Sequence, residues 1–235
     1  MRFSLVLPCY NEREHIEVSL QKIRTSLDFS LGNENYEILL VDDGSEDGTR
    51  EHLKSISNEK NIKVFFHPEN RGRGAAVKQG LKLAQGNSTG FIDIDCEVSE
   101  VYIPKCLQIV EEGSDLVIGA RTYSVSFSPR GIMRYLSHEG YKKVVKHALK
   151  TKVSDSETGY KFFSQRAKEK ILSESRFDNW FFDTEVIQIC ESGGLKIEEV
   201  PVLFVRNSKK TSTVRVIPDS LNYLKSLYRF KRQIP

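Results

Sequence analysis

Short apolar runs alternate with amphipathic stretches along the N-terminal half of the chain, and this alternation limits the possible folds more than any other feature. Each run has the length of a buried strand, and the stretch after the first run carries Ile16, Leu20 and Ile23 at helical spacing. The pattern predicts strands over 3–7, 36–41, 62–66, 90–94, 115–119 and 201–205, and helices over about 14–27, 49–56 and 75–84. A strand-helix order of this kind predicts an α/β fold with a mainly parallel central sheet flanked by helices.

Polar loops follow the first, second and fourth of these strands. They contain Pro8 to Glu12, Asp42 to Ser45 and Asp93 to Glu97. Because ligands of open parallel sheets bind beyond the carboxyl ends of the strands, we expect the three loops to form one rim. Arg71 and Arg73 follow the third strand and add positive charge there. Acidic side chains beside arginines indicate a ligand that carries phosphates and a metal ion.

Asp93 and Asp95 are two residues apart in a predicted strand, so their side chains point to the same side. Two adjacent carboxylates repel each other in a poorly hydrated crevice unless a cation or a shared proton offsets their charge. An oxygen-only pair suits Mg2+ or Mn2+ bound to substrate phosphates, and Glu97 adds a third carboxylate. The alternative is a strand that ends in a turn with both aspartates solvated.

Several motifs occur in a fixed order along the chain. They are Leu7-Pro8-Cys9-Tyr10-Asn11-Glu12, Val41-Asp42-Asp43-Gly44-Ser45, Asn70-Arg71-Gly72-Arg73-Gly74 and Asp93-Ile94-Asp95, followed by Gly119-Ala120-Arg121, Asp155 to Phe163 and Trp180 to Glu185. Together they resemble the motifs of inverting family 2 glycosyltransferases of the GT-A fold. The dolichyl-phosphate mannose and glucose synthases and their bacterial polyprenyl-phosphate counterparts are the most similar members. The resemblance implies a Rossmann-like sheet with an acceptor-side extension at its C-terminal end.

The resemblance also implies a role for each matching residue. The residues implied for the nucleotide sugar are Pro8, Tyr10, Asn11, Glu12, Asp42, Asp43, Arg71, Lys78 and Asp93. Asp93, Asp95 and Glu97 would hold Mg2+ or Mn2+ against the diphosphate, and Asp95 is assigned to catalysis as well. A cation there stabilises the negative charge that develops on the leaving phosphate.

The segment after 115–119 no longer alternates between strand and helix. Residues 121–131 are expected to form a loop, and 132–149 an amphipathic helix rich in basic residues. The resemblance implies that arginines of this region bind the phosphate of an acceptor, which makes Arg121, Arg130 and Arg134 the candidates. The alternative for most of these cations is a solvated surface.

The nature of the acceptor decides whether the site needs a base. A lipid phosphate is already an anion near neutral pH, with a second pKa of about 6, and needs only to be positioned. An alcohol needs a carboxylate to take its proton, and Asp155 is the first candidate, followed by Asp183 and Glu185. In the alternative, Asp155 is structural and caps the turn before Gly159.

The C-terminal segment is basic. Between Arg206 and Pro235 the chain has eight Lys or Arg residues and one acid, although its formal net charge is only +3. Apolar residues recur at helical spacing from Pro218 onward, which predicts a basic amphipathic helix. This helix either docks on the domain or contacts an anionic membrane surface peripherally. No apolar run approaches the roughly 20 residues of a membrane-spanning helix.

The cysteine pattern bears on the setting of the protein. Its four cysteines are far apart and form no Cys-x-x-Cys pair, which argues against zinc and disulfides and favours a cytoplasmic setting. We expect one catalytic domain over 1–205, with a nucleotide-sugar half at about 1–120 and an acceptor half at about 121–205, and a basic segment over 206–235.

The resemblance implies an inverting enzyme that moves glucose or mannose from a UDP- or GDP-sugar to a polyprenyl phosphate in cell envelope biosynthesis, at the inner face of a membrane. The alternatives are a soluble or polysaccharide hydroxyl acceptor, a nucleotidyltransferase and a noncatalytic nucleotide-sugar binder. A nucleic-acid partner is not expected, because the basic residues are not interleaved with aromatic residues that could stack on bases.

Overall fold

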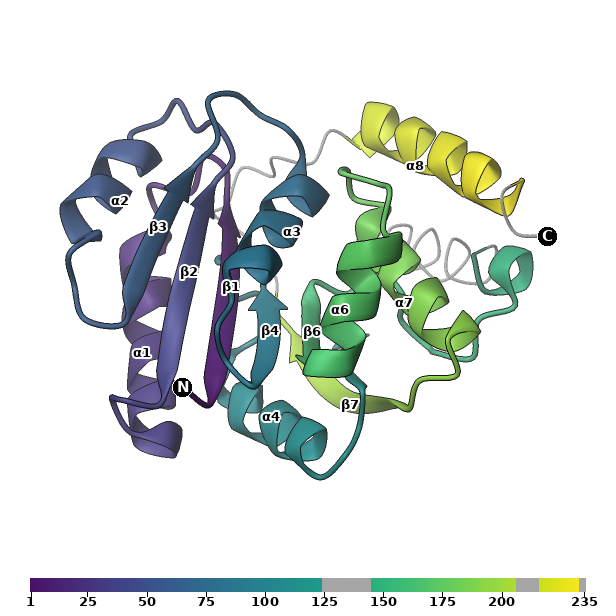
Figure 1. Cartoon of the computed structure of the whole chain (residues 1–235). Coiled ribbons are helices and arrows are strands. Elements are labelled where there is room, and N and C mark those ends of the chain that lie inside the picture. Colours follow the sequence, from purple (N-terminus) through teal and green to yellow (C-terminus); the bar gives the residue numbers. More distant parts are fainter. Residues whose placement is uncertain (124–144, 206–215, 233–235) are drawn as a thin grey trace.

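A seven-stranded sheet with helices on both faces forms the centre of the molecule (Figure 1). The computed structural model describes residues 1–123, 145–205 and 216–232. In chain order the strands are β1 (Phe3–Cys9), β2 (Tyr36–Asp42), β3 (Ile62–Phe66), β4 (Ser88–Ile92), β5 (Leu116–Tyr123), β6 (Tyr160–Ser164) and β7 (Ile197–Phe204). The helices are α1 (Ile16–Leu31), α2 (Thr49–Ile56), α3 (Arg73–Leu83), α4 (Ile103–Glu111), α6 (Gln165–Glu174), α7 (Phe182–Ser192) and α8 (Val216–Lys231), with a 3-10 turn at Glu100–Tyr102. Across the sheet the order is β3-β2-β1-β4-β6-β5-β7.

The first four strands are parallel to one another, as the alternation in the sequence predicts. Successive side chains point to opposite faces of the sheet. Leu5 and Leu7 therefore pack with α1 and α4 on one face, whereas Val6 packs with α3 on the other. Burial on both faces explains why these strands are continuous apolar runs, and the predicted α/β class is confirmed.

β6 runs antiparallel to both of its neighbours, β4 and β5, and the sequence does not predict this direction. This strand is not among the predicted ones, although its residues Tyr160 to Phe163 are all buried. The antiparallel register pairs Tyr160 with Ile92, at the carboxyl end of β4. The loop before β6 therefore lies beside the loop of Asp93 to Glu97.

Several observed element boundaries differ from the predicted ones. α1 continues to Leu31, α3 begins at Arg73, β4 covers Ser88–Ile92 and β7 begins at Ile197. The helices α4, α6 and α7 have no counterpart among the predicted ones. Of the helix expected over 132–149, only the residues from 145 onward lie in the described part of the chain, and these are helical. Helix ends depend on local capping, which hydrophobic spacing does not report.

α8 docks on the C-terminal half of the chain through a small apolar cluster. Tyr223 and Leu227 form this cluster with Phe181 and Val145, and the Tyr223 hydroxyl shares a hydrogen bond of 2.5 Å with Thr184 of α7. Of the two alternatives for the predicted C-terminal helix, docking is observed. Within the described ranges, no helix combines the length and the apolar character that crossing a bilayer requires.

Gly80 of α3 faces β1 so closely that a Cβ atom there would lie 2.2 Å from Cγ1 of Val6. We expect Gly80→Ala to lower the free energy of unfolding by about 1–3 kcal/mol, because the packed interface has no room for a methyl group. Chemical denaturation measures the change. Lys82→Ala, at an exposed position of the same helix, is the control and should differ from the wild type by less than about 0.5 kcal/mol. Wild-type stability of Gly80→Ala would contradict this packing.

Candidate active site

The carboxyl ends of β1 and β2 bring two of the predicted loops into contact. The backbone N–H of Asp43 donates to the carbonyl oxygen of Cys9 over 2.8 Å. Asn11 has a φ of 56°, a left-handed conformation that asparagine tolerates. Its Oδ1 accepts a hydrogen bond of 2.9 Å from the N–H of Glu46. Asn11 thus fastens the first loop to the second.

The other residues predicted in the first loop lie along the same rim. Pro8 is in β1, opposite Val41 of β2. Glu12 is buried, and its N–H donates to Oγ1 of Thr49 over 2.9 Å. Tyr10 stays at the surface with 37% of its area exposed. The loop therefore offers one exposed aromatic ring above a fixed backbone.

Asp42 and Asp43 organise the rim from inside the fold. Oδ2 of the buried Asp42 accepts a hydrogen bond of 2.9 Å from Nε of Arg50. The two carboxylate oxygens of Asp43 accept hydrogen bonds of 3.0 Å from the N–H of Arg71 and of 2.9 Å from the N–H of Gly72. Asp43 therefore fixes the backbone of the loop that precedes α3, while the Arg71 side chain remains exposed.

Arg73 is held from several sides beside the predicted metal carboxylates. Its Nε and Nη2 donate to Oδ1 of Asp93 over 2.8 and 2.6 Å, and its Nη1 donates to Oδ2 of Asp183 over 2.6 Å. The guanidinium lies 5.5 Å from the ring centroid of Phe91 and 5.2 Å from that of Trp180. These contacts make Arg73 a fixed positive charge at the carboxyl end of β4.

The protein groups around Asp93 partly desolvate its carboxyl, although 45% of the side chain stays exposed. That desolvation is the largest influence on it and, together with the charges of Asp95 and Asp183, raises the pKa of Asp93, whereas Arg73 opposes the rise. A carboxylate in this situation favours the approach of a further cation.

Asp93, Asp95 and Glu97 line one small cavity of about 30 Å³. The remaining residues that line it are Val98, Arg121, Gly159, Tyr160 and Phe204. An all-oxygen donor set fits Mg2+ or Mn2+. In the described part of the chain, no three His, Cys, Asp or Glu side chains are grouped closely enough to hold an ion. The oxygen donors that line the cavity thus suit a divalent ion in chemical type but not in spacing. Asp93, Asp95 and Glu97 have to move closer together to bind one ion jointly.

Asp183 and Lys161 continue the row of charges into the C-terminal half of the chain. Asp183, in the first turn of α7, is 2% exposed, and its Oδ1 lies 3.4 Å from Nζ of Lys161. Lys161 is fully buried in β6 and donates to the backbone carbonyls of Ser156 and Thr158. Burial lowers the pKa of the Lys161 ammonium, and Asp183 counteracts this. The row thus ties β6 to α7 and to the preceding loop.

Asp155 forms a buried bidentate pair with Arg121. Nε and Nη2 of Arg121 donate to its two oxygens over 2.7 and 2.9 Å, and the backbone N–H of Arg121 donates to Oδ2 over 3.2 Å. The structure therefore joins the predicted base to a predicted acceptor-phosphate arginine. The role of Asp155 as a base stays a prediction, and it would require release of Arg121.

The remaining predicted residues are less central. Lys78 forms an ion pair of 2.5 Å with Asp178, in the segment that precedes α7. Arg130 and Arg134 lie outside the described residues, so their predicted acceptor roles stay predictions.

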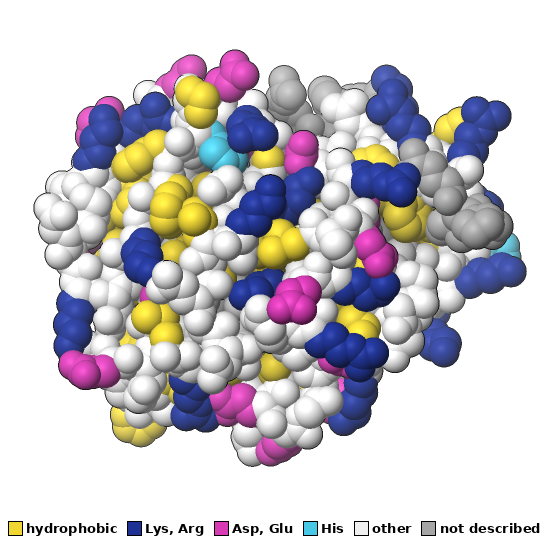
Figure 2. All heavy atoms as spheres, viewed as in Figure 1, with side chains coloured by type: hydrophobic (Ala, Val, Ile, Leu, Met, Phe, Trp, Pro, Cys, Tyr) yellow, Lys and Arg dark blue, Asp and Glu magenta, His cyan; other side chains and the backbone are white. Residues whose placement is uncertain are grey.

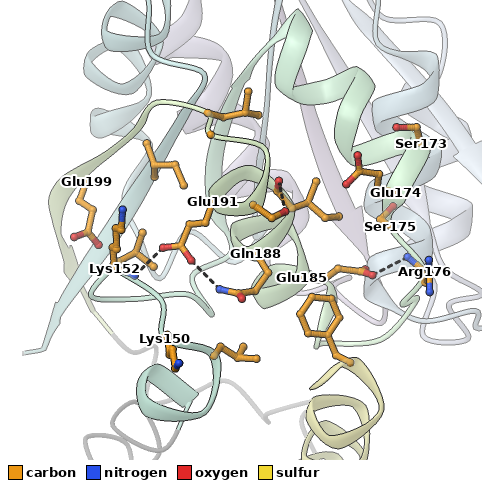
Figure 3. A pocket seen from close by; sticks show the side chains of 18 residues that line it. Lys150, Lys152, Ser173, Glu174, Ser175, Arg176, Glu185, Gln188, Glu191 and Glu199 are labelled. Atoms are coloured by element: carbon orange, nitrogen blue, oxygen red, sulfur yellow. Dashed lines mark hydrogen bonds between the residues drawn. The ribbon is translucent and has the colours of Figure 1, made fainter. Parts of the chain in front are cut away.

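A wider cavity of about 1000 Å³ lies along another face of α7 (Figure 3). Glu185 lines it and accepts hydrogen bonds of 2.8 and 3.0 Å from the N–H groups of Arg176 and Phe177. Glu191 likewise accepts from the N–H of Lys152 over 2.7 Å. These carboxylates support loops, and the cavity shares no lining residue with the small one. Glu185, a predicted alternative base, therefore lies apart from the rim.

Sequence reasoning names Arg73 without a specific role and misses Lys161. A signal for Lys161 is present, because a lysine inside the apolar run Tyr160 to Phe163 requires a buried partner. The sequence does not show that this partner is Asp183. His67 is also missed, although its Nδ1 lies 2.6 Å from Oδ1 of Asp43.

Comparison with known proteins gives a family match. The model of the family described as Glycosyl transferase family 2 matches residues 4–172. The chain is 27% identical over 217 residues to a dolichyl-phosphate beta-glucosyltransferase of Dictyostelium discoideum. This match covers 85% of this chain and 65% of that protein. It is 36% identical over 121 residues to a dolichol-phosphate mannosyltransferase of Pyrococcus furiosus, with coverage of 52% and 33%. The chain spans from about a third to two thirds of the length of such relatives.

A solved structure shows the same fold. The mannosyltransferase PcManGT from Pyrobaculum calidifontis, in complex with GDP-Man and Mn2+, matches 97% of this chain and 64% of its own with a TM-score of 0.64 and 16% identity. The predicted GT-A fold is thereby confirmed.

The two bonds from Asp43 to the loop before α3 can be tested by amide exchange. Amide hydrogen bonds to a carboxylate are worth about 1.5–3 kcal/mol, so Asp43→Ala should accelerate exchange at Arg71 and Gly72 by about 10-fold or more. Asp47→Ala, which removes a carboxylate bound to other backbone N–H groups, is the control and should leave these two amides unchanged. Unchanged protection in Asp43→Ala would show that other contacts hold the loop.

Proposed function

Because the chain belongs to glycosyl transferase family 2, we propose that it transfers glucose or mannose, with inversion, from a UDP- or GDP-sugar to a polyprenyl phosphate. The observation that carries the proposal is the composition of one cavity, which Asp93, Asp95 and Glu97 line together with Arg121. Carboxylates that suit a divalent ion thus lie beside a cation that suits an anionic acceptor. Transfer requires donor and acceptor to meet at such short range.

The rim loops supply the donor side. The residues proposed to bind the nucleotide sugar are Pro8, Tyr10, Asn11, Glu12, Asp42, Asp43, Arg71, Lys78 and Asp93. Mg2+ or Mn2+ held by Asp93, Asp95 and Glu97 would offset the charge that develops on the leaving diphosphate. The Mn2+ and GDP-Man in the structure of PcManGT support a divalent ion and a nucleotide-sugar donor.

The pairing of Asp155 with Arg121 favours a phosphate acceptor over a hydroxyl acceptor. An alcohol needs a base, and both oxygens of Asp155 accept hydrogen bonds from Arg121. A phosphate is already ionised, so it needs the cation and not the base. Arg130 and Arg134 are proposed to assist Arg121, and the names of the dolichyl-phosphate and dolichol-phosphate relatives support a lipid phosphate. A soluble or polysaccharide hydroxyl remains the alternative acceptor.

The exposed face of α8 fits peripheral contact with an anionic membrane surface, which a lipid acceptor requires. Leu224 and Tyr228 are 44% and 59% exposed and lie one turn apart, next to the exposed Lys225 and Arg229. Figure 2 shows Lys and Arg side chains around this helix with apolar side chains between them. Apolar groups flanked by cations suit the boundary between acyl chains and anionic headgroups.

Release of nucleoside diphosphate tests the reaction. UDP-glucose and GDP-mannose are each incubated with Mn2+ or Mg2+, with and without a short polyprenyl phosphate. We expect release from one donor only when both the metal and the lipid phosphate are present, because the lipid phosphate displaces the diphosphate from the sugar and the metal offsets the charge on that leaving group. Asp95→Ala should reduce the rate by about 100-fold or more, since it removes a ligand of the ion.

Two outcomes would contradict the proposal. Formation of pyrophosphate would indicate a nucleotidyltransferase. Turnover with a soluble alcohol, abolished by Asp155→Asn, would establish the hydroxyl acceptor.

The membrane contact has its own test. Lys225→Glu combined with Arg229→Glu should weaken binding to vesicles that contain anionic lipid by about 10-fold or more, because each basic residue near such a surface contributes about 1 kcal/mol. Sedimentation with vesicles measures the bound fraction. Lys82→Glu, a charge reversal on α3, is the matched control and should bind as the wild type does. If the wild type, the double variant and Lys82→Glu all bind the vesicles equally, the membrane contact does not involve Lys225 and Arg229.

A further inference from the structure

Asp183 belongs to none of the rim loops, yet one arginine connects it to the predicted metal carboxylates. It is in the first turn of α7, whereas Asp93 directly follows β4. Arg73 of α3 lies between the two and donates to both. Three elements that are distant in the sequence thus meet at one guanidinium group.

Arg73 engages the two oxygens of Asp93 unequally. Its Nε and Nη2 both donate to Oδ1. Oδ2 lies toward Gly159, where a Cβ atom would be only 2.1 Å from it, and Gly159 lines the small cavity. The ion pair therefore leaves Oδ2 beside Gly159, which lines the same small cavity as Asp95 and Glu97.

The orientation of Arg73 is set by Asp183. The rings of Phe91 and Trp180 lie against the guanidinium and restrict its tilt. Such contacts do not fix rotation within the guanidinium plane, whereas the 2.6 Å bond from Nη1 to Asp183 does so together with the two bonds to Oδ1 of Asp93. Nζ of Lys161 lies 3.4 Å from the other oxygen of Asp183, so this buried carboxylate has a second cation beside it.

We propose that Asp183 is a positioning residue, which through Arg73 fixes the Asp93 carboxylate so that Oδ2 faces the cavity of the divalent ion. The inference rests on the metal site of the proposed function. It makes metal affinity in the nucleotide half depend on a helix of the acceptor half. Groups that orient a metal ligand typically contribute about 10-fold to 100-fold to metal affinity.

Mn2+ binding tests the inference without any sugar transfer. The Mn2+ titration, with and without UDP or GDP, is followed by the electron paramagnetic resonance signal of free Mn2+. Quenching of Trp180, the single tryptophan of the chain and a neighbour of Arg73, gives a second readout. We expect Asp183→Asn to weaken Mn2+ binding by about 10-fold or more, because the amide no longer holds the charged fork of Arg73.

The matched control is Glu185→Gln. Glu185 is also a buried carboxylate in the first turn of α7, but it accepts from backbone N–H groups of Arg176 and Phe177. This variant should lose thermal stability and bind Mn2+ as the wild type does. Arg73→Lys keeps the positive charge but loses the forked guanidinium, so it should show the same weaker Mn2+ binding. It replaces Asp183→Asn in this test if that variant does not fold.

Turnover separates positioning from a purely structural role. In Asp183→Asn the Mn2+ concentration for half-maximal rate should rise by about 10-fold, while kcat at saturating Mn2+ stays within about 3-fold of the wild type. A folded Asp183→Asn that binds Mn2+ as the wild type does overturns the inference and leaves the proposed function standing. Weaker Mn2+ binding without transfer from either donor supports the inference and refutes the proposed reaction. A wild-type chain that binds no Mn2+, even with nucleotide, overturns both.

Discussion

The rim of this sheet is built from carboxylates that other parts of the chain must neutralise. Asp42 is paired with Arg50 of α2, Asp93 with Arg73 of α3. Asp155 is paired with Arg121 at the end of β5. A carboxylate removed from water without a partner costs several kcal/mol, so each pair fixes the position of the element that supplies its cation. The arrangement of helices around the sheet therefore depends on the same charges that form the site.

The sequence predicts the first half of the sheet well because its residues are constrained on both faces. In β2 every side chain from Tyr36 to Asp42 is buried, and such runs have few other interpretations. The carboxyl ends of parallel strands lie along one edge, so the proximity of the loops at Asn11 and Asp43 follows as well. β6 is not predicted, and its direction does not follow from the sequence, because Tyr160 to Phe163 would be buried in either orientation.

The residues of the site are predicted less completely than the strands. Asp93 and Asp95 line one cavity as predicted, but β4 ends at Ile92 and the chain turns after it, so strand alternation does not explain their proximity. Tertiary packing determines which cations pair with these carboxylates. Neither spacing nor periodicity in the sequence identifies the ion-pair partner of Arg73 or of Asp155. Asp155 illustrates the difference: its type suggests a base, whereas its contact with Arg121 holds both of its oxygens.

The position of β6 has a consequence for folding. β4 pairs with β1 along one edge, and its other edge lacks a strand until residues 160–164 have been synthesised. Phe91 of β4 packs against Phe163 of β6 in the folded protein, with ring centroids 5.7 Å apart. Before β6 pairs with β4, the free edge of β4 is therefore unpaired and has an exposed apolar side chain beside it. Bringing β6 back across the intervening chain costs loop-closure entropy, which makes its insertion a late, non-local step. During synthesis the first four strands thus expose an edge that other chains can join, and this interval is where the nascent protein is most prone to aggregate.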